Sequence, residues 1–141
     1  MVNISELIEL DRLARQDGQK YTKKRFLYSE LNLGKGRHFL GIVGPRGAGK
    51  TILIKQLALA SKESFYMSLD TFKDDVFQTV KELAEKLSVK MFLIDEVHMH
   101  PGFEESLKKI YDFLNVKVVF TSSMALVMYQ SEYDLSRRVL L

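Results

Sequence analysis

One stretch constrains the fold of this chain more than any other: an apolar run, a glycine-rich turn and a segment with helical spacing follow one another. The apolar run is Phe39 to Val43, and the turn and helix start read Gly44-Pro45-Arg46-Gly47-Ala48-Gly49-Lys50-Thr51-Ile52. Gly44 to Thr51 matches G-x-x-x-x-G-K-[ST] at every specified position. Glycines let the backbone curl so that successive N–H groups point inward, where they bind phosphate oxygens. The sequence therefore predicts a phosphate-binding loop between a buried strand and a helix.

The chemistry of such a loop gives its polar residues distinct roles. The helix that begins at Lys50 adds the positive end of its dipole to the site. We expect Lys50 to reach the β- and γ-phosphates and the Thr51 hydroxyl to bind Mg²⁺. Arg46 can neutralise phosphate or stay in solvent, and we favour solvent. The predicted nucleotide-binding residues are Gly44, Pro45, Arg46, Gly47, Ala48, Gly49, Lys50, Thr51 and Ile52, with Ser122 from a later strand.

Length, cysteine content and charge exclude several classes of protein. The 141 residues are enough for one domain with a real core, and the absence of cysteine excludes disulfides and thiolate metal sites. We find no apolar run long enough to span a bilayer and no signal peptide, so we expect a cytoplasmic protein without a membrane contact. Basic residues gather between Lys20 and Arg37, which allows a nucleic-acid or membrane-facing patch, although a solvated helix face is the commoner meaning.

Strand and helix signals alternate along the chain. An amphipathic helix is expected at 4–16, with Asn3 as its cap, and a basic helix at 20–31. Strands are expected at 38–43, 64–69, 90–94 and 117–120, with a last one starting at 138; helices are expected at 50–60, 76–87, 103–114 and 124–130. This alternation predicts an α/β fold with a parallel sheet and helices on both faces. We divide the chain into an N-terminal helical segment, 1–36, packed on a core domain, 37–141.

Polar side chains follow the predicted strands directly, where the chemistry of such sheets collects. Asp95 follows the strand that begins at Met91, and a carboxylate there can hold the Mg²⁺ of the phosphate loop. Glu96 is the candidate base for the attacking water. Thr121 is the candidate group that senses the γ-phosphate, and Ser122 is the alternative because a one-residue register shift exchanges the two.

Other candidates are less specific. Arg138, or Arg137 beside it, can serve a neighbouring subunit's γ-phosphate in a homo-oligomer, and solvated surface arginines are the alternative. His98 and His100 flank Met99 next to the acids. We find no metal partner for either histidine, and we expect them at a helix entry or on the surface.

These motifs together resemble those of the P-loop ATPases of the AAA+ superfamily. Gly44–Thr51 looks like Walker A, Met91–Glu96 like Walker B, and Thr121 or Ser122 like sensor 1. More narrowly, the chain resembles prokaryotic predicted ATPases with a G-P-R-x-x-G-K-T loop, a Y-x-S-L-D strand, a D-E-[IV]-H motif and a T-[GS]-S-S strand end. Their D-L-[SA]-G-R segment is similar to residues 134–138, which aligns the family's arginine with Arg138.

The resemblance implies a three-layer, RecA-like P-loop fold that binds and hydrolyses Mg-ATP at the β–γ bond. The catalytic residues would be Lys50, Glu96, Thr121 and Arg138, and the metal ligands Thr51 and Asp95. Because the chain ends at Leu141, we expect it to lack the family's helical lid, so turnover by the isolated piece would be weak. Two alternatives stay open: a D-E-x-H nucleic-acid motor fragment, from Asp95 to His98, and a nucleotide-dependent binding module without turnover.

Overall fold

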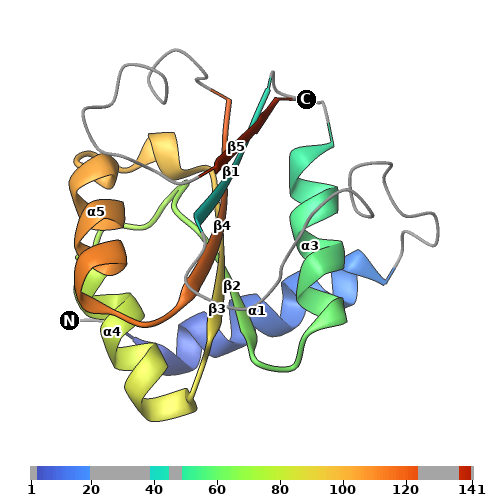
Figure 1. Ribbon diagram of the computed structural model, residues 1–141. Helices are drawn as coiled ribbons and strands as arrows, with labels where there is room; N and C mark the ends of the chain where they lie inside the picture. Colours follow the sequence, from blue (N-terminus) through green and yellow to red (C-terminus); the bar gives the residue numbers. More distant parts are fainter. Residues whose placement is uncertain (1–2, 20–38, 45–48, 124–136, 141) are drawn as a thin grey trace.

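The computed structural model describes residues 3–19, 39–44, 49–123 and 137–140, and it has an α/β architecture (Figure 1). Five strands form one sheet in the order β2-β3-β4-β1-β5, and every neighbouring pair is parallel. The strand bounds are β1 Phe39–Val43, β2 Ser64–Ser68, β3 Met91–Asp95, β4 Lys117–Ser122 and β5 Arg137–Leu140. Because all strands run the same way, their carboxyl ends share one edge, where α3 also begins.

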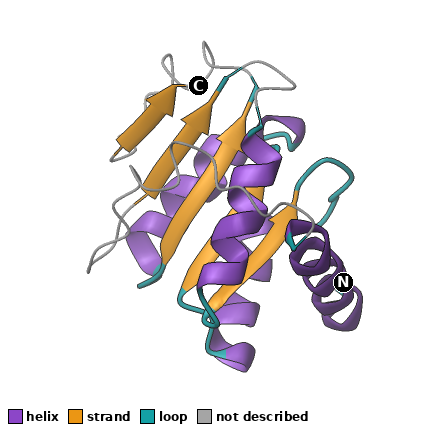
Figure 2. Cartoon of the chain, turned by 90° about the vertical axis from the view of Figure 1, so that its right-hand side faces the viewer, coloured by secondary structure: helices purple, strands orange, loops and turns teal. Residues whose placement is uncertain are grey.

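Helices cover both faces of the sheet (Figure 2). Their bounds are α1 Ile4–Gly18, α3 Lys50–Ala60, α4 Val76–Leu87 and α5 Phe103–Phe113, with a short 3-10 helix, η1, at Val97–Met99. Helices α4 and α5 lie on one face, whereas α3 lies on the other with α1 beside it (Figure 1). This three-layer arrangement confirms the predicted fold. The expected helices at 20–31 and 124–130 fall outside the described residues.

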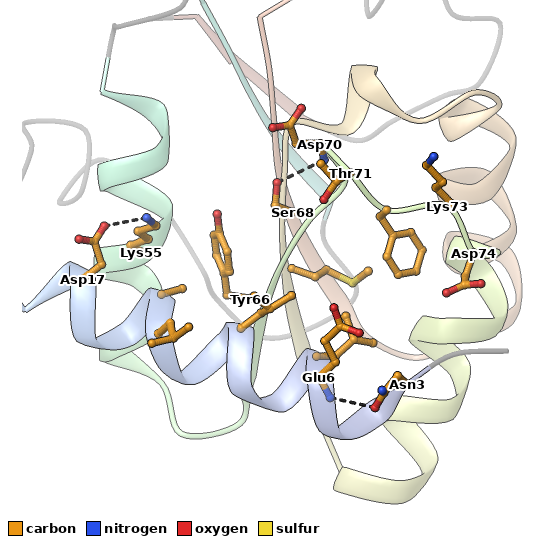
Figure 3. Close-up of a pocket in the computed structure, with 16 residues that line it drawn as sticks. Asn3, Glu6, Asp17, Lys55, Tyr66, Ser68, Asp70, Thr71, Lys73 and Asp74 are labelled. Carbon is orange, nitrogen blue, oxygen red and sulfur yellow. Dashed lines mark hydrogen bonds and ion pairs between the residues drawn. The ribbon is translucent and has the colours of Figure 1, made fainter.

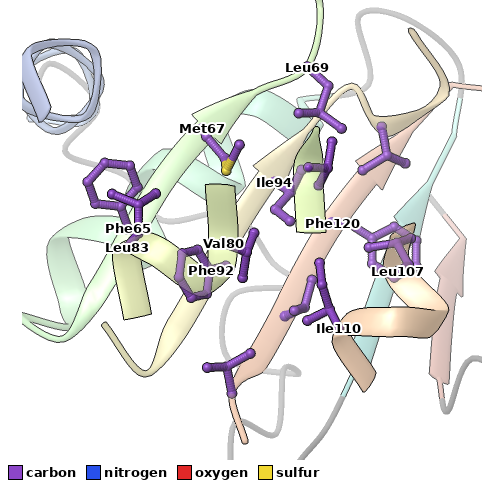
Figure 4. Packing of buried hydrophobic residues seen from close by; sticks show 14 of the residues in the cluster. Phe65, Met67, Leu69, Val80, Leu83, Phe92, Ile94, Leu107, Ile110 and Phe120 are labelled. Atoms are coloured by element: carbon purple, nitrogen blue, oxygen red, sulfur yellow. The ribbon is translucent and has the colours of Figure 1, made fainter. Parts of the chain in front are cut away.

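Alternation along the strands divides the core between the two faces. Phe92 and Phe120 point to the α4–α5 side, where they meet the apolar stripes of those helices (Figure 4). Phe39 belongs to the same cluster. Leu40, Ile42, Leu93 and Val119 point to the α3 side and pack on Leu53, Ile54 and Leu57. A strand that is buried on both faces has a continuous run of apolar residues, and such runs made these strands predictable from the sequence.

Gly41 is needed where β1 passes β4. A Cβ atom at this position would lie 2.7 Å from Cζ and 2.8 Å from Cε2 of Phe120, whose side chain is fully buried. Only a residue without a side chain lets the ring lie against this strand. The glycine thus leaves room for the Phe120 ring over β1, the strand that leads into the phosphate loop.

Helix α1 is fixed to the edge of the sheet by polar contacts as well as by packing. Asn3 caps it, because its Oδ1 accepts the N–H of Glu6 at 3.0 Å. The guanidinium of Arg15 donates to the carbonyls of Ala58 and Ser64, the latter at 2.5 Å. Asp11 accepts the backbone N–H of Tyr66 at 2.8 Å. The N-terminal helix therefore belongs to the packed core.

Candidate functional site

The two ends of the glycine-rich loop are anchored at the carboxyl edge of the sheet. Gly44 follows β1, and its N–H donates to the carbonyl of Ser122 at the end of β4, over 3.2 Å. Gly49 precedes α3 with φ 88°, a left-handed conformation that favours glycine. Pro45, Arg46, Gly47 and Ala48 lie outside the described residues. The geometry thus defines where the predicted phosphate loop leaves the sheet and where it enters the helix.

Lys50 links the beginning of the loop to its end. Its side chain is 4% exposed, and its Nζ donates to the carbonyl of Gly44 at 2.8 Å. Thr51 is half-buried beside it in the first turn of α3. That turn contains no carboxylate, so nothing in it opposes the positive end of the helix dipole. Such a helix start accommodates an anion.

Asp95 ends β3 and is almost fully buried, with 2% of its surface exposed. Its Oδ2 accepts a hydrogen bond from the Tyr66 hydroxyl at 2.8 Å, and its Oδ1 accepts one from the Thr121 hydroxyl. By strand alternation, Asp95 and Thr121 lie on the α3 side of the sheet with Leu93 and Val119. Two hydroxyl donors therefore hold this carboxylate on the side from which α3 brings Thr51.

This geometry distinguishes Thr121 from Ser122, which the sequence left as alternatives. Thr121 pairs with Ile42 and Ser122 with Val43, so their side chains point to opposite faces. The hydroxyl of Thr121 meets Asp95, whereas the backbone carbonyl of Ser122 meets Gly44. Each residue thus contacts a different part of the candidate site.

Tyr66 is a site residue that the sequence reasoning missed. It lies in β2, where the sequence showed it only as the first residue of the Y-x-S-L-D strand, and its hydroxyl reaches Asp95 at the end of β3. Burial raises the pKa of the Tyr66 phenol, and the charge of Asp95 raises it further. The hydroxyl therefore remains a proton donor. One signal was available: tyrosine, unlike its apolar neighbours, brings a polar tip that needs a partner when buried.

Glu96 adopts a left-handed conformation with φ 57°, which turns the chain out of β3 and into η1. Its N–H donates to Oγ1 of Thr121 at 2.9 Å, so the threonine hydroxyl contacts both acids. The Glu96 carboxylate is 21% exposed, and its Oε2 lies 3.5 Å from Nε2 of His98. The two consecutive acids thus differ in surroundings: Asp95 is enclosed and Glu96 reaches solvent.

Of the two places expected for His98, a helix entry or the surface, the surface is wrong for its side chain. It lies in η1 with only 8% of its side chain exposed. Its Nε2 lies 2.9 Å from Oγ of Ser123, and its Nδ1 lies 3.4 Å from the Ser123 nitrogen. His100 contacts the carbonyls of Asp74 and Pro101 instead, each at 3.0 Å, on the side of the loop after β2. Of these two histidines, His98 is the one that lies beside Glu96.

The two candidate arginines lie in β5, which pairs with β1. Arg137 pairs with Leu40 and Arg138 with Gly41, so both backbone positions precede the carboxyl edge at Val43. The pairing brings Arg138 to the strand that leads into the phosphate loop. Their role towards a neighbouring subunit stays a prediction.

A separate groove of about 710 Å³ lies between α1 and the chain after β2 (Figure 3). Asp17, Lys55, Tyr66 and Asp70 are among its lining residues, and Lys55 pairs with Asp17 at 2.7 Å. Tyr66 connects this groove to Asp95. The described residues of the glycine-rich loop, Gly44 and Gly49 to Thr51, do not line this groove.

The donor set at the sheet edge fits Mg²⁺. Asp95 offers carboxylate oxygens and Thr51 a hydroxyl, the hard oxygen ligands that Mg²⁺ prefers. Within the part of the chain that the structure describes, no group of three or more His, Asp or Glu side chains could enclose a metal. A site with few protein ligands is usual for Mg²⁺, which keeps several waters and binds substrate phosphates.

Among the described residues, no helix is long and apolar enough to cross a bilayer.

Comparison with known proteins identifies related chains. Residues 36–141 match the sequence model of the family described as "AAA domain". "Uncharacterized protein MJ1637" of Methanocaldococcus jannaschii is 29% identical over 140 residues, covering 84% of this chain and 29% of the relative. "Origin recognition complex subunit 4" of Schizosaccharomyces pombe is 30% identical over 129 residues, covering 77% of this chain and 13% of the relative. The chain thus spans less than a third of either relative.

A solved structure supports the fold. RuvB T158V of Thermotoga maritima superposes with a TM-score of 0.53 at 18% identity, covering 99% of this chain and 45% of that one. At this identity the likeness concerns the architecture of the parallel sheet and its helices.

Proposed function

The chain belongs to the AAA domain family, and from this premise we propose that it binds Mg-ATP and hydrolyses the β–γ bond. One observation carries the proposal: Asp95, Glu96 and Thr121 form a hydrogen-bonded unit at the sheet edge where the glycine-rich loop begins. A parallel α/β sheet binds ligands at the carboxyl ends of its strands. The unit has the groups that phosphoryl transfer requires, since that reaction depends on positioning and electrostatic stabilisation.

In this proposal the loop from Gly44 to Thr51 binds the triphosphate. Lys50 would exchange its bond to the Gly44 carbonyl for the β- and γ-phosphates, because a charged acceptor is the stronger partner. The N-terminus of α3 would stabilise the same charge. Adenine is proposed from family membership alone.

Thr51 and Asp95 would hold Mg²⁺, which bridges the β- and γ-phosphate oxygens and neutralises charge when bound. Glu96 would orient and deprotonate the attacking water, because its carboxylate is partly exposed while its backbone is fixed to Thr121. Thr121 contacts both acids, which supports a role in sensing the γ-phosphate.

Assembly with other subunits is part of the proposal. One relative is named as a subunit of an origin recognition complex, which supports a multi-subunit state. In a homo-oligomer, Arg138 or Arg137 would contact the neighbour's γ-phosphate. Binding to nucleic acid and a cytoplasmic location are likewise parts of the proposal.

The test is nucleotide binding and turnover by three variants. We expect Lys50→Ala to weaken Mg-ATP binding by about 10–150-fold, the worth of one charge-assisted hydrogen bond. Lys62→Ala, an exposed lysine beyond α3, is the matched control and should bind as the parent does. We expect Glu96→Gln to keep the affinity and lose about 10²–10⁴-fold in kcat. Equal affinity in Lys50→Ala and the parent would refute the proposed site.

Removing the metal gives an independent check. At ATP concentrations near 100 times Kd, binding should stabilise the fold by about 2.7 kcal/mol. With EDTA present, this stabilisation should shrink if Thr51 and Asp95 hold Mg²⁺. A single-turnover assay separates hydrolysis from a nucleotide-dependent binding module, which would show the stabilisation without product.

A further inference from the structure

The side chain of His98 connects Glu96 to the end of β4. Its Nε2 lies 3.5 Å from Oε2 of Glu96 and 2.9 Å from Oγ of Ser123. The histidine is more deeply buried than the acid, with 8% of its side chain exposed against 21% for Glu96. A buried ring beside a partly exposed carboxylate can fix the position of that carboxylate while leaving it open to water.

The contacts of Ser123 define the tautomer of this ring. The backbone N–H of Ser123 can only donate, so Nδ1, 3.4 Å away, accepts and carries no proton. In the neutral ring the proton then belongs to Nε2, which faces the Ser123 hydroxyl and Glu96. The Nε2–H is thus directed at the Ser123 hydroxyl, 2.9 Å away, and Oε2 of Glu96 lies 3.5 Å from the same nitrogen.

We propose that His98 is a positioning residue for the carboxylate of Glu96, held in place by Ser123. The inference rests on the proposed function, in which Glu96 activates water. Glu96 is then fixed at two points: its N–H is bonded to Thr121, and its carboxylate faces His98. Both contacts depend on the end of β4, because Thr121 binds the Glu96 N–H and Ser123, two residues later, binds His98.

This arrangement has a kinetic consequence. A glutamate side chain has several rotatable bonds, and an unrestrained carboxylate would face the water only part of the time. With Oε2 beside the imidazole, the other carboxylate oxygen is left for the water. Loss of the restraint affects the chemical step, whereas nucleotide binding depends on the loop and α3. Misplacement of a reacting group by about 1 Å can cost about 100-fold in rate.

The experiment measures kcat and nucleotide Kd for histidine and serine variants of the full chain. We expect His98→Ala to lower kcat by about 10–100-fold, with Kd changed less than about twofold. His98→Gln keeps an N–H donor and should recover part of the loss. Ser123→Ala should lower kcat by about 2–12-fold, the worth of one ordinary hydrogen bond, and should add nothing to His98→Ala.

The matched control is His100→Gln, in the same stretch of chain but bonded to the carbonyls of Asp74 and Pro101. It should leave kcat unchanged. If His98→Ala retained the parent's kcat, or increased it, the positioning role would be refuted. Glu96→Gln separates this failure from that of the proposed function: if it were as active as the parent, the role of Glu96 would fail first.

A spectroscopic measurement tests the geometry without turnover. Long-range ¹H–¹⁵N spectra of the ring should identify His98 as the Nε2–H tautomer in the folded chain. The Ser123→Ala variant, which keeps the backbone N–H but removes the hydroxyl, should shift the Nε2 resonance more than that of Nδ1. An Nδ1–H tautomer, or a ring that Ser123→Ala leaves unchanged, would contradict the proposal even if no hydrolysis were detected.

Discussion

The hydrogen bond between Tyr66 and Asp95 makes a measurable contribution to stability. Tyr66→Phe removes only the hydroxyl, and Asp95, at 2% exposure, has little water to replace it. A hydrogen bond to a charged group contributes about 1.5–3 kcal/mol. For a domain of this size, that corresponds to a fall in Tm of about 4–10 °C. Urea unfolding, with m unchanged, measures the loss directly.

A double-mutant cycle isolates this bond from other effects of the substitution. With Asp95→Ala in the background, the acceptor is gone and Tyr66→Phe should cost less than about 0.5 kcal/mol. The coupling between the two sites should then reach at least about 1 kcal/mol. The reasoning would be refuted if Tyr66→Phe matched the parent in stability, or if it cost the same in both backgrounds.

Two further stability predictions follow from packing and from the attachment of α1. Gly41→Ala would place a methyl group 2.7 Å from the buried ring of Phe120, and overpacking of this kind costs about 1–3 kcal/mol. Phe120→Leu in the same chain should recover part of that loss, and additive costs in urea unfolding would contradict the clash. Arg15→Lys should lose about 1–3 kcal/mol, because an ammonium cannot reach the carbonyls of Ala58 and Ser64 together. A circular-dichroism melt that overlays the parent's would refute this.

The elements were predictable because their signals are local. The helices at Lys50–Ala60 and Val76–Leu87 have the predicted bounds. The first follows the glycine-rich turn directly, and the second has Asp75 as its cap and an apolar face at helical spacing. The strand expected to end at Phe120 continues to Ser122, because pairing with β1 extends through two polar residues. Likewise α1 continues to Gly18, where the sequence suggested an end at position 16. Pairing and packing, which are not local, decide such ends.

The residues of the candidate site also differ in whether local sequence could predict them. Gly44, Lys50, Asp95 and Glu96 were recognisable because the loop has a fixed spacing and the acids follow an apolar strand. The contacts from Tyr66 to Asp95 and from Ser123 to His98 join residues 29 and 25 positions apart. No sequence spacing predicts contacts between residues so far apart in the chain. The choice between Thr121 and Ser122 was also not predictable, because it depends on the register of β4 against β1.

The polar bonds of α1 have a consequence for any shortened version of this protein. Strand β2 is an edge of the sheet, and α1 engages both an N–H and a C=O of it, through Asp11 and Arg15. An expressed fragment that began at residue 36, where the family match begins, would lack this cover. The bare edge would then offer free backbone groups to a second chain, and self-association through strand addition would follow.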